Sequence, residues 1–163
     1  MDRIQAAIAK ARSTRNSKGQ DTRPNRRVQK PTATTESWSA LRSCSVSDKT
    51  MAQNRIVTYG PGKATPGSIS FDLLRTKILL KMQANGWKRL AVTSPTPGNG
   101  KSTVILNLAF SLSKQPNLHT IVADMDMRLP MLAKTMGLRG DRTFSNVLAG
   151  ETDFAEVAVR PRP

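Results

Sequence analysis

Cysteine and acidic residues are scarce in this chain of 163 residues. Cys44 is the single cysteine, which excludes an intramolecular disulfide. Asp and Glu number 11 against 26 Lys and Arg, so the formal net charge is +15. This balance favours polyanionic partners such as nucleotides, nucleic acids or an anionic membrane surface. A solvated basic leader without a specific anionic partner is the competing explanation.

Long apolar runs and aromatic residues are also in short supply. No stretch approaches the roughly 20 apolar residues of a membrane span, and the N-terminal MDRIQ carries charge where a signal peptide needs an apolar run. We therefore expect a cytoplasmic protein that meets a membrane through a partner or its basic surface. The chain has two Trp, one Tyr and four Phe but no stacking platform, recognition helix or zinc spacing. A specific nucleic-acid module is therefore disfavoured.

The apolar residues are distributed unevenly along the chain. In residues 1–12 they recur at helical spacing among basic residues, which predicts a short basic amphipathic helix, either frayed in solvent or serving as a docking peptide. Residues 13–68 are mostly polar and show no periodicity, so we expect a disordered linker. Residues 69–163 hold apolar blocks that could fill a core. We therefore predict a compact part of about 100 residues behind a disordered N-terminal leader.

The compact part alternates helical and strand patterns. A helical stripe of Phe71, Leu74, Ile78 and Met82 ends at Asn85-Gly86, and a second helical stripe follows residue 103. Short apolar runs at residues 89–94 and 120–124 predict strands on either side of that second helix, and two short helices end at Gly137 and Gly150. Strand, loop, helix and strand form a βαβ unit, which predicts an α/β fold with a parallel sheet and flanking helices. Only two strands are evident, so the sheet looks incomplete.

A Gly-rich loop, SPTPGNGKST, occupies residues 94–103 between the first predicted strand and the second helix. It matches the phosphate-loop pattern G-x-x-x-x-G-K-[ST] except that Pro95 replaces the first Gly. Glycines allow backbone N–H groups to turn inward, Lys101 would reach the β- and γ-phosphates, and the Ser102 hydroxyl would bind Mg²⁺. The residues expected to hold nucleotide are Pro97, Gly98, Asn99, Gly100, Lys101, Ser102 and Thr103.

Two carboxylates, Asp124 and Asp126, follow the second predicted strand. Strand alternation places them on one side, and ligands of open parallel sheets bind beyond the carboxyl ends of the strands. The two side chains are therefore expected to face the phosphate loop. One would order Mg²⁺ and the other would accept a proton from an attacking hydroxyl or water.

Together the loop SPxPGxGKST and the later D-x-D-x-R-x-P resemble the bacterial tyrosine kinase family, the P-loop kinases of capsule and exopolysaccharide synthesis and export. The resemblance implies a Rossmann-like P-loop NTPase domain, with ATP and Mg²⁺ as cofactors and tyrosine autokinase activity. It implies Asp124 as catalytic base beside Lys101, and Asp126 as metal ligand with Ser102. It also implies a partner at the inner membrane, a polysaccharide co-polymerase or transmembrane activator.

The chain departs from that family at three places. The oligomerisation motif E-x-x-R-x-x-R falls on Ile69, Asp72 and Arg75, so only its last Arg is retained and self-association is expected to be weakened. A third acidic motif and the C-terminal tyrosine cluster are missing, and Tyr59 is the single tyrosine. We therefore expect a C-terminally truncated member with impaired kinase activity.

A second P-loop class competes with the kinase interpretation. Partition and division-site ATPases use the same loop as a nucleotide switch for dimerisation. They carry an extra lysine early in the loop, where this chain has Thr96. The kinase-like interpretation is therefore preferred.

Overall fold

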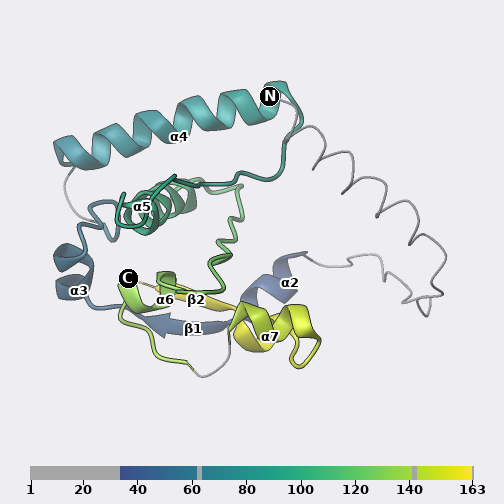
Figure 1. The fold of residues 1–163 in the computed structure, drawn as a ribbon. Helices are drawn as coiled ribbons and strands as arrows, with labels where there is room; N and C mark the ends of the chain where they lie inside the picture. Colours follow the sequence, from purple (N-terminus) through teal and green to yellow (C-terminus); the bar gives the residue numbers. More distant parts are fainter. Residues whose placement is uncertain (1–33, 62–63, 141–142, 163) are drawn as a thin grey trace, which may run out of the picture. The chain divides into compact units, whose positions relative to one another are not determined.

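The computed structural model describes residues 34–61, 64–140 and 143–162. The chain divides into a unit of residues 1–36 and a compact unit of residues 37–163, and the fold below is that of the second unit. The predicted helix over residues 1–12 and the predicted linker up to residue 33 lie outside the described residues. The described part is mixed α/β, with several helices and a small parallel sheet (Figure 1).

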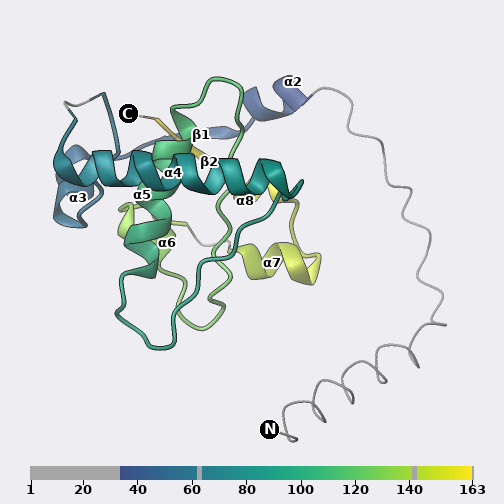
Figure 2. The same ribbon diagram turned by 90° about the horizontal axis from the view of Figure 1, so that it is seen from above.

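Two helices account for most of the regular structure. Helix α4 spans Pro66–Ala84 and begins with a capping box, in which the side chains of Thr65 and Ser68 accept each other's backbone N–H groups. It ends at Asn85, followed by Gly86 at φ +65°, which confirms the predicted stop. Helix α5 spans Lys101–Ser113. Seen from above, α4 lies across α5 and packs against it (Figure 2).

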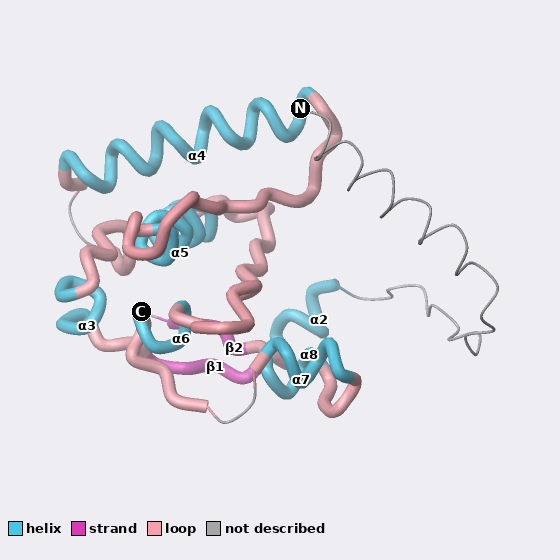
Figure 3. The backbone as a smooth tube through the Cα atoms, in the orientation of Figure 1, coloured by secondary structure: helices cyan, strands magenta, loops and turns pink. Residues whose placement is uncertain are grey.

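The prediction of strands at residues 89–94 and 120–124 is wrong. Residues 87–94 and 118–126 are extended loops on either side of α5 (Figure 3), and neither pairs with a strand in the described part of the chain. Their apolar side chains Leu90, Val92 and Ile121 are exposed. An apolar run favours a strand locally, but a parallel ladder also needs a partner strand and helices that cover both faces. Neither segment has these here.

The parallel sheet instead pairs two segments that carry no strand pattern. Strand β1, Arg42–Ser45, lies beside β2, Val159–Arg162, with Cys44 opposite Pro161. Pro161 is tolerated because each strand of a two-stranded sheet has a free edge. The sheet is parallel as expected, but it is formed by other residues.

Residues 42–58 are ordered, which contradicts the predicted disordered linker of residues 13–68 over this part of the chain. Met51 in helix α3, Asp48–Gln53, is 2% exposed and Ile56 is 4% exposed, and both belong to a core cluster with Val46 and Leu106. Sparse apolar residues in a polar segment escape a periodicity search, yet each is buried by packing against distant elements. The shorter helices are α2 Thr34–Ser39, α6 Leu132–Thr135, α7 Phe144–Ala149 and α8 Phe154–Val157.

The buried face of α5 differs from the predicted stripe. Leu106, Asn107, Leu108 and Ser111 are buried, whereas Val104 is exposed. Gly137 and Gly150 follow α6 and α7 at positive φ, as their predicted roles as helix ends require. No helix among the described residues is long and apolar enough to cross a membrane.

Candidate functional site

The phosphate-loop pattern forms an open turn that leads directly into helix α5. Gly98 and Gly100 have φ of +78° and +77°, and among the described residues no heavy atom beyond the chain neighbours lies within 4 Å of a Cβ built on either glycine. The left-handed conformation explains why glycine stands at both positions, and the open space leaves the backbone accessible. The loop therefore has the backbone shape that lets N–H groups face an anion.

Side chains of the loop bond mainly to one another. The Lys101 ammonium donates to Ser94 Oγ at 3.2 Å, Ser94 Oγ donates to the Thr96 carbonyl at 2.8 Å, and Asn99 Nδ2 donates to Thr96 Oγ1 at 2.8 Å. Lys101 thus bends back over the loop from the first residue of α5. Lys101 was expected here from the sequence, whereas no binding role was predicted for Ser94 and Thr96.

The N-terminus of α5 carries no side-chain cap in the described part of the chain. Gly100 is its N-cap residue, and the first intrahelical bond runs from Val104 N to the Gly100 carbonyl at 2.9 Å. The N–H groups of residues 101–103 therefore have no acceptor within the helix, which gives this end a partial positive charge. Such an end can bind an anion together with the ammonium of Lys101.

The two carboxylates of the predicted acidic motif both accept backbone hydrogen bonds. Asp124 Oδ2 accepts from Met131 N at 2.8 Å and Leu132 N at 2.9 Å, so it holds the start of α6. Asp124 Oδ1 accepts from Asp126 N at 3.2 Å, and Asp126 Oδ1 accepts from Arg128 N and Leu129 N. In this structure the two carboxylates therefore stabilise the turn in which they lie.

The structure brings the loop residues together but records no hydrogen bond or ion pair between the loop and Asp124 or Asp126 within the described residues. In that same part of the chain, no group of three or more His, Cys, Asp or Glu side chains could hold a metal ion. A divalent cation here would need additional oxygen ligands from a bound phosphate and water.

Asn107 fixes the position of α5 and was not identified from the sequence. Its side chain is fully buried, and its Oδ1 accepts from the backbone N–H groups of Val57 and Thr58 at 2.8 and 3.2 Å. Its Nδ2 donates to the carbonyls of Arg55 and Thr103 at 3.0 and 2.9 Å. This one amide ties residues 55–58 to the helix that carries the phosphate loop.

A second polar cluster joins α4 to α5. Asp72 Oδ1 accepts from Arg75 Nη1 at 2.7 Å and from Ser111 Oγ at 2.6 Å, and Arg75 also donates to the Ser111 carbonyl at 3.0 Å. The hydrogen bond from Ser111 is the main cause that lowers the pKa of the Asp72 carboxyl. Arg75, the arginine that matches the last position of the oligomerisation motif, thus forms its hydrogen bonds with Asp72 and Ser111 of the same chain.

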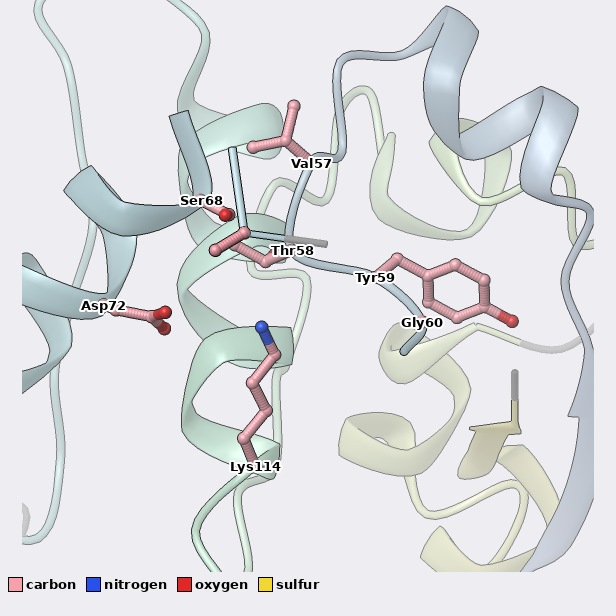
Figure 4. A pocket seen from close by; sticks show the side chains of 8 residues that line it. Val57, Thr58, Tyr59, Gly60, Ser68, Asp72 and Lys114 are labelled. Atoms are coloured by element: carbon pink, nitrogen blue, oxygen red, sulfur yellow. The ribbon is translucent and has the colours of Figure 1, made fainter. Parts of the chain in front are cut away.

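A small polar pocket adjoins this cluster (Figure 4). Asp72 of α4 and Lys114 after α5 point into it below Thr58, and Lys114 helps to lower the pKa of Asp72. The other lining residues are Val57, Tyr59, Gly60, Ala64 and Ser68. No residue of the phosphate loop lines this pocket, so it is separate from the candidate phosphate site.

Comparison with known proteins gives matches to kinases over part of the chain. The chain is 34% identical over 88 residues to the tyrosine-protein kinase CpsD of Streptococcus agalactiae, which covers 53% of this chain and 37% of that protein. It is 33% identical over 95 residues to the putative tyrosine-protein kinase EpsB of Ralstonia nicotianae, which covers 58% of this chain and 12% of that protein. About half of this chain resembles bacterial tyrosine-protein kinases.

The match spans little more than a third of the length of the CpsD relatives. No protein-family model matches the chain, and no solved structure matches it. The comparisons therefore support a kinase-like relationship for about half the chain.

Proposed function

We propose that this chain binds the phosphates of ATP through residues 94–103, as the nucleotide-binding part of a protein resembling the tyrosine autokinases of capsule and exopolysaccharide synthesis. The observation that carries the proposal is the uncapped N-terminus of α5 behind Gly98 and Gly100, with Lys101 folded over the same loop. The similarity of about half the chain to CpsD and EpsB favours the kinase class over the partition-type ATPases.

Each residue has a distinct part in this proposal. The N–H groups of residues 98–103 would bind phosphate oxygens, and the Lys101 ammonium would exchange Ser94 Oγ for a phosphate oxygen. Ser102 and Asp126 would be the two protein ligands of Mg²⁺, and the metal would neutralise charge on the phosphates when bound. Asp124 would serve as base, and its Oδ2 now accepts the N–H groups of Met131 and Leu132 at the start of α6.

Tyr59 is held by hydrogen bonds in this structure, so it is a poor acceptor for a phosphoryl group. Tyr59 is the single tyrosine of this chain, and its hydroxyl lies 2.7 Å from the Arg162 carbonyl and 3.2 Å from the Val46 carbonyl. Transfer to Tyr59 would require breaking these bonds. From the resemblance to the capsule and exopolysaccharide kinases, we also propose a cytoplasmic protein that acts with a membrane-bound polysaccharide co-polymerase as its partner.

Titration of the purified full chain with ATP and Mg²⁺, by calorimetry, tests the phosphate site. Lys101→Ala should weaken ATP binding at least about tenfold, because it removes a charge-assisted hydrogen bond. Lys49→Ala, an exposed lysine of α3, is the matched control and should bind as the parent does. Equal affinity of the Lys101→Ala variant and the parent would refute the phosphate site.

Phosphotransfer is measured separately, with radiolabelled ATP and a tyrosine-rich peptide. Label on the peptide supports the kinase class. Nucleotide-dependent dimerisation without any label would instead favour the partition-type ATPase, since that class uses nucleotide as an assembly switch.

A further inference from the structure

Helix α4 carries a second apolar face, on the side away from α5. At 3.6 residues per turn, Ile69, Leu73 and Leu80 fall within about 40° of one another, opposite Phe71 and Met82. Ile69, Leu73 and Leu80 are 48%, 60% and 63% exposed. Phe71 and Met82 are half-buried, and α4 lies over α5 with its other side turned outward (Figures 1 and 2). Packing in the described part of the chain therefore does not account for this outer stripe.

The same outer face is basic. Lys77 and Lys81 lie beside the stripe by helical position, both are exposed, and Lys88 and Arg89 follow the end of the helix. The ion pair recorded among the described residues, Arg75 with Asp72, is on the side facing α5, and Asp72 is the single acidic residue of α4. No carboxylate of the described chain forms an ion pair with these four cations.

We propose that this outer face, residues 69, 73, 77, 80 and 81, docks on a bilayer rich in anionic phospholipid. A helix of 19 residues is about 28 Å long, and its outward side can lie along a flat surface. Leucines enter the headgroup boundary while lysines reach the lipid phosphates. Trp87, which is exposed just beyond the helix, adds a side chain that favours this boundary.

Charge argues against the other occupants of this face. A second copy would place Lys77 and Lys81 against an equally basic surface, and the N-terminal residues 1–12 are also basic. An acidic polypeptide satisfies the charges, but an isolated convex helix offers it no groove. A lipid surface supplies both the negative charge and the apolar layer.

The test is sedimentation of the full chain with vesicles of phosphatidylcholine containing 30% phosphatidylglycerol, compared with pure phosphatidylcholine vesicles. The parent should bind the anionic vesicles and lose binding as salt is raised. Leu73→Gln/Leu80→Gln should reduce the partition coefficient about tenfold or more. Lys77→Gln/Lys81→Gln should do so by a similar factor without altering the apolar stripe.

Matched controls distinguish binding through this face from non-specific binding to the vesicles. Leu148→Gln replaces an exposed leucine of α7, and Lys49→Gln an exposed lysine of α3, and both should bind as the parent does. Circular dichroism checks that each variant is folded. Parent-like binding by both double variants, or an equal loss in the controls, overturns the proposal. Light scattering that shows a dimer lost only in the leucine variant would also overturn it, in favour of a second copy.

Discussion

Replacing Asn107 by Ala should destabilise the protein strongly, because this side chain connects α5 to the residues that precede α4. The substitution removes the acceptor of two backbone N–H groups, those of Val57 and Thr58, and the donor to the Arg55 and Thr103 carbonyls. A buried polar group left without a partner costs about 1–3 kcal/mol. The Thr58 hydroxyl keeps its hydrogen bond to the Asn107 backbone carbonyl at 2.8 Å, so it is not left without a partner. The cost is therefore worked out from the two N–H groups that lose their acceptor.

The free energy of unfolding should therefore fall by about 3 kcal/mol, a large fraction of the roughly 5–15 kcal/mol typical of a domain. Urea denaturation followed by far-ultraviolet circular dichroism measures the change, provided that the slope with urea is the same for both proteins. Asn99→Ala is the matched control, since Asn99 is exposed and, within the described part of the chain, its side chain forms one hydrogen bond, to the Thr96 hydroxyl. It should cost less than about 0.5 kcal/mol.

A loss below about 0.5 kcal/mol in the Asn107→Ala protein would refute the reasoning. It would mean that residues 55–58 do not depend on α5 for their backbone hydrogen bonds. The hydrogen bonds between this segment and Asn107 of α5 would then contribute little to stability.

Three further predictions concern a glycine and two titratable groups. Gly137→Ala should cost about 1–2 kcal/mol in the same denaturation assay, because Gly137 has φ +72° and a Cβ there would lie 3.2 Å from Thr50 Cγ2; Gly140→Ala, in open space, should be near neutral, and equal costs would contradict this. The pKa of Asp72 is lowered in the folded state, so its contribution to the free energy of unfolding is present above its unfolded pKa of about 4 and is lost as pH falls below that value. Asp72→Asn should therefore reduce the loss of stability at acid pH, and an unchanged loss would contradict the role of the Asp72–Arg75–Ser111 cluster. Burial is the main cause that raises the pKa of Tyr59, so the folded state holds this proton more tightly and stability should fall as pH rises through about 10; a Tyr59→Phe protein with the same alkaline decline would show that Tyr59 is not responsible.

Features set by neighbouring residues could be predicted from the sequence. The stop of α4 at Asn85-Gly86 and the glycines at positions 137 and 150 each depend on a positive φ, which the local sequence signals. The phosphate-loop glycines and the start of α5 at Lys101 follow from the same kind of signal. These features require no knowledge of distant residues.

Pairing between distant segments could not be predicted. Strand β1 is RSCS and β2 is VRPR, and neither has the alternation or the apolar run that marks a strand. The apolar runs at residues 89–94 and 120–124 have that signal but no partner in the described chain. Asn107 and Ser111 are polar and yet buried on α5, so a search for apolar periodicity found only part of the buried face: Leu108 is buried as predicted, whereas Val104 is exposed.

Helix α5 supports the candidate site more than the extended segments do. Residues 87–94 lead into the phosphate loop, and residues 118–126 lead to Asp124, but neither segment is held by a ladder in the described part. The geometry of the loop therefore depends on α5, which is fixed by Asn107 and, one turn later on the same buried face, by the Asp72–Ser111 bond. Asp124 is fixed through α6, which packs against α5. Order at the phosphate loop and at the acidic turn thus has a common structural source, although no direct bond between the two is recorded among the described residues.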